Sequence, residues 1–169
     1  KSYRPAAALV LLALAVGCAA LDNFRAVEPG AFYRSGQMEP AQLRRILDRH
    51  DIRTVINLRG EHPEEAWYRD EVAACQEAEV AHYSLQWSKS RLPEPESLQQ
   101  FVAWCAETDR PILVHCQGGT HRTGVASACY VLLSGGSLDE ARRQLGLLFG
   151  DAHIGRLLGV PVLGFELAS

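Results

Sequence analysis

The most constraining stretch of this sequence is a ten-residue segment with a cysteine, two adjacent glycines and an arginine, which reads HCQGGTHRTG over 115–124. The apolar run Pro111–Val114 before it predicts a short buried strand, and Val125–Leu133 after it predicts a buried helix. Cys116 therefore lies on a tight loop between a strand and the N-terminus of a helix, and Arg122 closes that loop.

A loop of this kind is suited to bind an anion. The backbone N–H groups of a glycine-containing turn point inward, and the N-terminus of the following helix adds partial positive charge. The guanidinium of Arg122 is planar and permanently charged, so it can hold two oxygens of one phosphate group. The predicted phosphate-binding residues are therefore Gln117, Gly118, Gly119, Thr120, His121 and Arg122.

The same surroundings favour ionisation of the Cys116 thiol. An unperturbed cysteine titrates near ~8.5, and a helix N-terminus with cationic neighbours lowers that pKa. We hypothesise that the thiolate attacks a bound phosphate in line and forms a phosphocysteine, which water then hydrolyses. Thr123 is expected to donate its hydroxyl to the sulfur, and His115 to hold the loop from behind. The alternative is an inert buried cysteine, which leaves the glycines and the arginine unexplained.

The pattern His-Cys-x5-Arg-Thr-Gly resembles the signature of the cysteine-dependent protein tyrosine and dual-specificity phosphatases. The segments Phe32–Gln37 and Thr54–Glu61 extend the resemblance to the small bacterial dual-specificity-like branch. The form Cys-x-x-Gly-x-His-Arg-Thr-Gly also resembles the plant and fungal atypical phosphatases that act on inositol pyrophosphates. The resemblance runs from Phe32 to Gly150 and implies the α/β domain of these phosphatases.

The resemblance also implies a general acid that protonates the leaving oxygen. In the resembled family this is usually an aspartate in the loop after the strand that precedes the signature strand. Here that loop covers 86–95 and contains no aspartate, so Glu94 is the best substitute. Glu96 and Glu61 are fallbacks, and His62 is a weaker one. The alternative role of Glu94 is a charge at a helix entry that complements the helix dipole.

Hydrophobic periodicity predicts strands that alternate with helices along the chain. The expected strands are 24–27, 32–35, 54–58, 80–85 and 111–114. The expected helices are 40–48, 64–78, 96–107, 125–133 and 137–148, the last begun by a capping box at Ser137 and Glu140. This alternation predicts an α/β fold in a single domain, with a central, mostly parallel sheet flanked by helices.

Ligands of such sheets bind beyond the carboxyl ends of the strands. The rim of the site is therefore expected to include 35–37, 59–61 and 86–89. Arg59 and Lys89 are candidate second cations for an anionic substrate. Their alternative roles are solvated surface charges or partners of Glu61 or Glu64. Trp87 either walls the pocket or caps the core.

The N-terminus has the pattern of an export signal. Basic residues precede a run of small apolar residues over 5–20, which is short for a membrane span of about 20 residues. We expect residues 1–20 to be a signal peptide and 21–169 a dual-specificity-phosphatase-like catalytic domain. The segment 14–18 resembles a bacterial lipoprotein cleavage box, so Cys18 is a candidate lipid anchor. A plain signal peptide or an uncleaved anchor are the alternatives. The expected location is the periplasm or cell envelope.

Composition limits the partners. The net charge of −3 gives no bulk attraction to nucleic acid, so none is expected as a partner.

Besides Cys18 and Cys116 the chain has Cys75, Cys105 and Cys129, which we expect to be buried thiols. No Cys/His pairs have the spacing of a metal site, and no cofactor is expected. The expected partner is a phosphorylated protein or a small phosphate ester, and the membrane is contacted only through the N-terminal signal or anchor. We expect a monomer.

Two functional classes remain open. The first is an active phosphatase of phosphate monoesters, of protein tyrosine or dual-specificity type. The second is a catalytically weak relative that binds phosphate-bearing ligands, which the missing aspartate favours. Rhodanese-like sulfur transfer is a distant third. Inositol phosphates or phospholipid headgroups are alternative substrates, although the loop lacks the lysines common in inositol-phosphate phosphatases that resemble this chain.

Overall fold

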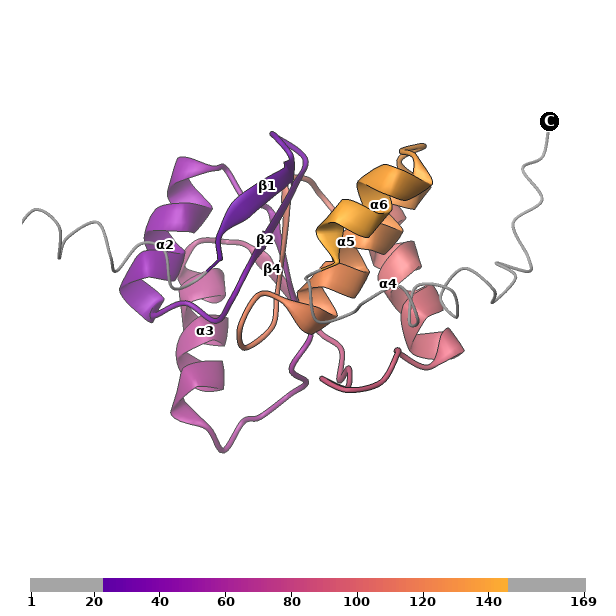
Figure 1. Cartoon of the computed structure of the whole chain (residues 1–169). Coiled ribbons are helices and arrows are strands. Elements are labelled where there is room, and N and C mark those ends of the chain that lie inside the picture. Colours follow the sequence, from indigo (N-terminus) through magenta and orange to yellow (C-terminus); the bar gives the residue numbers. More distant parts are fainter. Residues whose placement is uncertain (1–22, 146–169) are drawn as a thin grey trace, which may run out of the picture.

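A sheet between two layers of helices forms the centre of the computed structural model, which describes residues 23–145 (Figure 1). Its strands are β1 (Arg25–Glu28), β2 (Phe32–Ser35), β3 (Thr54–Asn57), β4 (Ala81–Ser84) and β5 (Ile112–His115). The helices are α2 (Pro40–Arg49), α3 (Ala66–Glu77), α4 (Pro95–Glu107), α5 (His121–Leu133) and α6 (Leu138–Gln144). The predicted α/β fold with a mostly parallel sheet is confirmed.

The strand order is β1-β2-β5-β3-β4, with β1 antiparallel to β2 and the other pairs parallel. His115, the last residue of β5, is in register with Ser35 on one side and Asn57 on the other. The carboxyl ends of the three central strands therefore meet at one point of the sheet edge. Cys116, the next residue, emerges between the turns that follow β2 and β3.

Side chains alternate between the two faces of the sheet, as strand geometry requires. In β5, Ile112 and Val114 enter the core cluster beneath α4 and α5, whereas Leu113 enters the cluster beneath α2 and α3. Figure 1 shows these two helical layers on opposite sides of the sheet. Because β5 is covered on both faces, every one of its side chains is buried.

The predicted elements match the structure closely, with differences at their ends. The predicted strand over 32–35 is confirmed residue for residue, and the other strands are displaced or shortened by one or two residues. The helix predicted from Val125 begins four residues earlier, at His121, so Arg122 and Thr123 lie in its first turn. The helix predicted to end at Leu148 ends at Gln144, because Leu145 has extended backbone angles.

The capping box at the start of α6 is confirmed. The Ser137 hydroxyl accepts from the Glu140 backbone N–H, and the Glu140 carboxylate accepts from the Ser137 backbone N–H. The predicted signal segment, including Cys18, lies outside the described residues, as does most of the tail after α6. Within 23–145, no helix is long and apolar enough to cross a membrane.

Candidate active site

The phosphate loop, residues 116–122, joins the end of β5 to the first turn of α5. Gly119 has a positive φ of 65°. A Cβ there would lie 2.5 Å from the backbone nitrogen of Gly36 and 2.6 Å from the carbonyl carbon of Ser35. The loop therefore packs against the turn after β2 so closely that only glycine fits at position 119.

Arg34 holds this loop from its outer side. The side chain is almost fully buried, with 1% exposed. Its Nη2 donates to the carbonyls of Gly119 at 3.0 Å and Thr120 at 3.2 Å, and its Nη1 donates to the carbonyl of Gln144 at 2.7 Å. Burial, helped by the charge of Arg25, lowers the pKa of Arg34 to about 10. Arg34 thus binds the carbonyls of Gly119 and Thr120, whereas the backbone N–H of Gly119 donates to Cys116.

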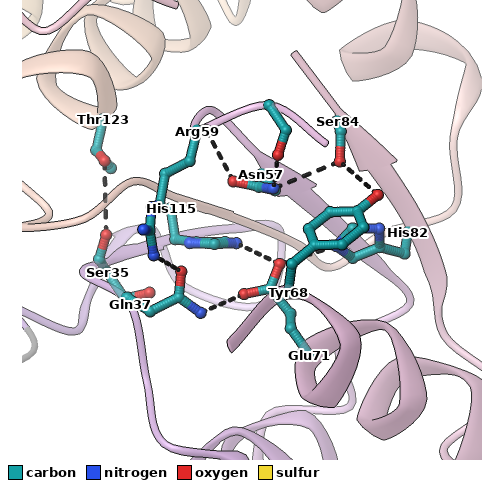
Figure 2. A network of polar contacts seen from close by, with 11 residues as sticks. Ser35, Gln37, Asn57, Arg59, Tyr68, Glu71, His82, Ser84, His115 and Thr123 are labelled. Carbon is teal, nitrogen blue, oxygen red and sulfur yellow. Dashed lines mark hydrogen bonds and ion pairs between the residues drawn. The ribbon is translucent and has the colours of Figure 1, made fainter. Parts of the chain in front are cut away.

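Cys116 lies within this turn, with 3% of the residue exposed. Burial by itself raises the pKa of the thiol. The opposing contributions outweigh it: hydrogen bonds from the side chain and backbone of Thr123, the charge of Arg122 and a backbone hydrogen bond from Gly119. The pKa of Cys116 is therefore below its ordinary value. The Thr123 hydroxyl also lies 3.5 Å from the carbonyl oxygen of Ser35 (Figure 2), so its donation to the sulfur stays a prediction.

Arg122 is anchored by two carbonyls on the rim of the site. Its Nη1 donates to the carbonyl of Leu58 at 3.2 Å and to that of Trp87 at 3.5 Å. These contacts hold the guanidinium next to Cys116, whose thiolate it stabilises. Trp87 itself is 4% exposed, packs edge-on against Phe101 and donates its indole N–H to Ser97. Of its two predicted roles, the structure supports the core cap.

A buried carboxylate, Glu71 of α3, lies behind the loop (Figure 2). One of its oxygens accepts from Nε2 of His115 at 3.0 Å and from Nε2 of His82 at 2.8 Å. The other oxygen accepts from the side-chain amide of Gln37. Burial raises the pKa of this carboxyl, but the charge of His115 and the hydrogen bonds from all three partners hold it well below its ordinary value. The prediction that His115 fixes the loop from behind is confirmed, and Glu71 is its anchor.

The two predicted rim cations differ in their surroundings. Nη1 of Arg59 donates to Oε1 of Gln37 at 2.7 Å, and its guanidinium carbon lies 3.4 Å from the centre of the Trp67 ring. Arg59 thus pairs with neither Glu61 nor Glu64, both of which were alternatives. Lys89 is exposed, and no hydrogen bond or ion pair holds it in the described part of the chain.

Glu94, the predicted general acid, is exposed and stands at the N-cap of α4, in the loop that leaves β4. Its side chain makes no capping hydrogen bond to α4. No direct contact with the helix N-terminus therefore occupies the carboxylate. Glu96, in the first turn of α4, and Glu61 are exposed as well. His62 contacts Glu64 and the carbonyl of Arg59. The identity of the acid stays a prediction.

The prediction of buried thiols is confirmed for two of the three remaining described cysteines. Cys75 and Cys105 are buried, Cys129 is partly buried, and all are unpaired thiols. Burial raises the pKa of each to about 12, in contrast to Cys116. Among the described residues, no cluster of histidine, cysteine and carboxylate side chains could hold a metal ion.

The sequence reasoning did not identify Glu71, Arg34 or Gln37 as part of the site. A signal for Glu71 was present, since it precedes the buried Ala74 and Cys75 by three and four positions and so lies on the same face of the helix. Arg34 likewise follows the buried Phe32 by two positions in a strand, which places both on one face.

Two loop glycines allow a matched test of the close packing. Gly119→Ala should lower the free energy of unfolding by about 2–4 kcal/mol, from overpacking and backbone strain. Gly118→Ala is the control, because a Cβ there would meet only the Thr120 hydroxyl at 3.7 Å. Gly118→Ala should change the free energy of unfolding by no more than about 0.5 kcal/mol. Urea denaturation of both variants measures this, and equal costs would contradict the described loop.

The lowered pKa of Cys116 predicts its reactivity. A thiol is alkylated as the thiolate, so the rate with iodoacetamide should rise with pH at a midpoint below the ordinary ~8.5. Removing the hydroxyl in Thr123→Val should move that midpoint upward. Mass spectrometry identifies the modified residue, with Cys105 as the internal control that stays unmodified in the folded chain. An unchanged midpoint in Thr123→Val would contradict the contact with the sulfur.

Comparison with known proteins adds to this geometry. Residues 19–152 match the family described as "DSP-PTPase phosphatase fused to NAD+ Kinase". The protein OCA1 of Mycosarcoma maydis, named as a tyrosine-protein phosphatase, is 32% identical over 132 residues, which cover 73% of this chain and 80% of OCA1. Human dual specificity protein phosphatase CDC14A is 30% identical over 84 residues, which cover 50% of this chain but only 13% of CDC14A.

A solved structure shows the same fold. The core catalytic domain of the PP-IP phosphatase SIW14 from S. cerevisiae superimposes with a TM-score of 0.61 and 24% identity, over 82% of this chain and 91% of that one. The family match spans most of the chain and includes the whole phosphate loop. The chain therefore belongs to the dual-specificity family of the protein tyrosine phosphatase superfamily.

Proposed function

We propose that this chain hydrolyses phosphate monoesters, with Cys116 as the nucleophile and Arg122 as the clamp on the phosphate oxygens. One observation carries the proposal: among the described cysteines only Cys116 has a lowered pKa, and it lies in a turn where the backbone N–H groups of Gly119 and Thr123 and the charge of Arg122 act on its sulfur. The other described cysteines, which lack such surroundings, have raised pKa values. Groups that stabilise the negative charge of the thiolate also stabilise the negative charge of a phosphoryl group during its transfer.

The reaction follows from this arrangement in two steps. The Cys116 thiolate attacks phosphorus and forms the S–P bond, while the ester P–O bond breaks and the leaving oxygen takes a proton from Glu94. Water then attacks the phosphocysteine, the Glu94 carboxylate takes a proton from that water, and the S–P bond breaks to release inorganic phosphate. Thr123 stabilises the departing thiolate through its hydroxyl. Glu94 is assigned from its place before α4 and its lack of a capping contact.

The proposed substrates are phosphotyrosine or phosphoserine and phosphothreonine on proteins, in line with the names of the relatives OCA1 and CDC14A. A second candidate is an inositol phosphate. The fold neighbour SIW14 is titled a PP-IP phosphatase, and this chain has a second arginine, Arg59, on the rim of its site. Both candidates share the phosphate monoester that the loop is proposed to bind.

Substitution of the nucleophile tests the proposal directly. The purified chain should hydrolyse p-nitrophenyl phosphate, Cys116→Ser should have no measurable turnover, and the variant should still bind inorganic phosphate. Arg122→Ala should lower kcat/KM by about 10²–10³-fold, the effect of removing a preorganised charge-stabilising donor. Activity that survives Cys116→Ser would refute the nucleophile. Phosphate binding without turnover in the parent would instead support the binding module.

The acid is tested by the leaving group. Glu94→Gln should slow alkyl phosphates more than aryl phosphates, because an alkoxide needs a proton and a nitrophenolate does not. The expected loss on alkyl substrates is about 10²–10⁴-fold, the range of positioned acid catalysis. Glu96→Gln is the matched control, two residues further along the chain in the first turn of α4. If Glu94→Gln slows alkyl and aryl phosphates equally, the acid is not Glu94. The same holds if Glu96→Gln is the variant that slows alkyl phosphates selectively.

A further inference from the structure

The turn after β3 sets Arg59 beside the phosphate loop. The side chain of Asn57 donates to the carbonyl of Gly60 at 2.9 Å and accepts from the backbone N–H of Arg59 at 2.8 Å, which closes the turn (Figure 2). Asn57 is in register with His115, the residue before the nucleophile. Arg59 therefore leaves the sheet edge where the phosphate loop begins.

The guanidinium of Arg59 is held on its face and on one edge. Its face lies against the ring of Trp67, with the guanidinium carbon 3.4 Å from the ring centre. On its edge, Nη1 donates to Oε1 of Gln37 at 2.7 Å. Gln37 is itself oriented, because its amide nitrogen donates to Glu71 and its backbone N–H donates to the carbonyl of Gln117 in the loop. Stacking leaves the other in-plane N–H donors available, and Arg59 is only partly buried.

Two guanidiniums share this rim without a carboxylate between them. Arg122 is anchored on the carbonyl of Leu58, the residue that precedes Arg59. Within residues 23–145, neither arginine forms an ion pair, and Glu71 reaches Arg59 only through the side chain of Gln37. Burial and the charge of Arg122 lower the pKa of Arg59, and the charges of Glu71, Cys116 and Glu65 only partly offset this. An anion that contacts both arginines would relieve the repulsion between them.

We propose that Arg59 forms a second anion-binding subsite beside the phosphate loop, and that the preferred substrates are phosphate monoesters with another anionic group near the scissile phosphate. The second group is a phosphate or a carboxylate, since the planar fork of an arginine binds either. This inference rests on the proposed function and adds to it the class of substrate. Gln37 and Trp67 act as positioning residues, because they hold Arg59 and do not touch the phosphate.

Two unreactive phosphonates test the subsite in the full chain. Methylphosphonate has one anionic group and methylenediphosphonate has two, and both are measured as competitive inhibitors of p-nitrophenyl phosphate hydrolysis. The parent should bind the diphosphonate about tenfold more tightly, which corresponds to about 1.4 kcal/mol. Arg59→Gln should abolish this preference and change the inhibition constant of methylphosphonate much less. Lys89→Gln, which removes the other predicted rim cation, should keep the preference.

The other outcomes of this experiment refute either the Arg59 subsite alone or the proposed function as well. Equal binding of the two inhibitors by the parent, a preference that survives Arg59→Gln, or its loss in Lys89→Gln would refute the subsite and leave the proposed function intact. A parent that does not hydrolyse p-nitrophenyl phosphate would refute the proposed function, and the subsite with it. Arg59→Lys, which keeps the charge but loses the planar fork, should retain part of the preference and serves if Arg59→Gln does not fold.

Discussion

The carboxylate of Glu71 is the interaction on which the rest of this site depends. It is buried and ionised, and a bare charge in such a place is strongly disfavoured unless it is hydrogen-bonded. Its donors come from β4, β5 and the turn after β2, so one side chain of α3 ties together three segments of the sheet edge. An ionised carboxylate only accepts hydrogen bonds, so Nε2 carries the hydrogen in both His82 and His115. Removal of Glu71 would leave these donors unpaired behind the nucleophile.

The three arginines of the site are held by carbonyl and amide oxygens rather than by carboxylates. Arg34 lies on the outer side of the phosphate loop and holds its carbonyls, whereas Arg122 and Arg59 lie on the rim and are held by carbonyls and an amide. In the part of the chain that the structure describes, none of the three forms an ion pair. The charge of Arg122 stabilises the Cys116 thiolate, and the same charge favours a bound anion.

The loop and the sheet edge constrain each other through backbone packing. Gly119 approaches the backbone of Ser35 and Gly36, and the backbone N–H of Gln37 donates to the carbonyl of Gln117 at 3.0 Å. These contacts run between the turn after β2 and the loop after β5, which are neighbours because those strands pair in parallel. The same strand pairing that builds the core therefore also shapes the phosphate loop.

The sequence by itself determined the phosphate loop and the order of the elements. Cys116, Arg122 and the loop glycines lie within one short segment, and the strands and helices show their own periodicity, so both could be read from local patterns. Only the tertiary structure decided that Glu71 anchors His115, that Arg34 holds the loop carbonyls and that Arg59 rests on Trp67. These side chains meet residues far along the chain, such as His115, which is 44 positions from Glu71. A charged residue has the same local pattern whether it faces water or a buried partner, and only the folded sheet brings that partner to it.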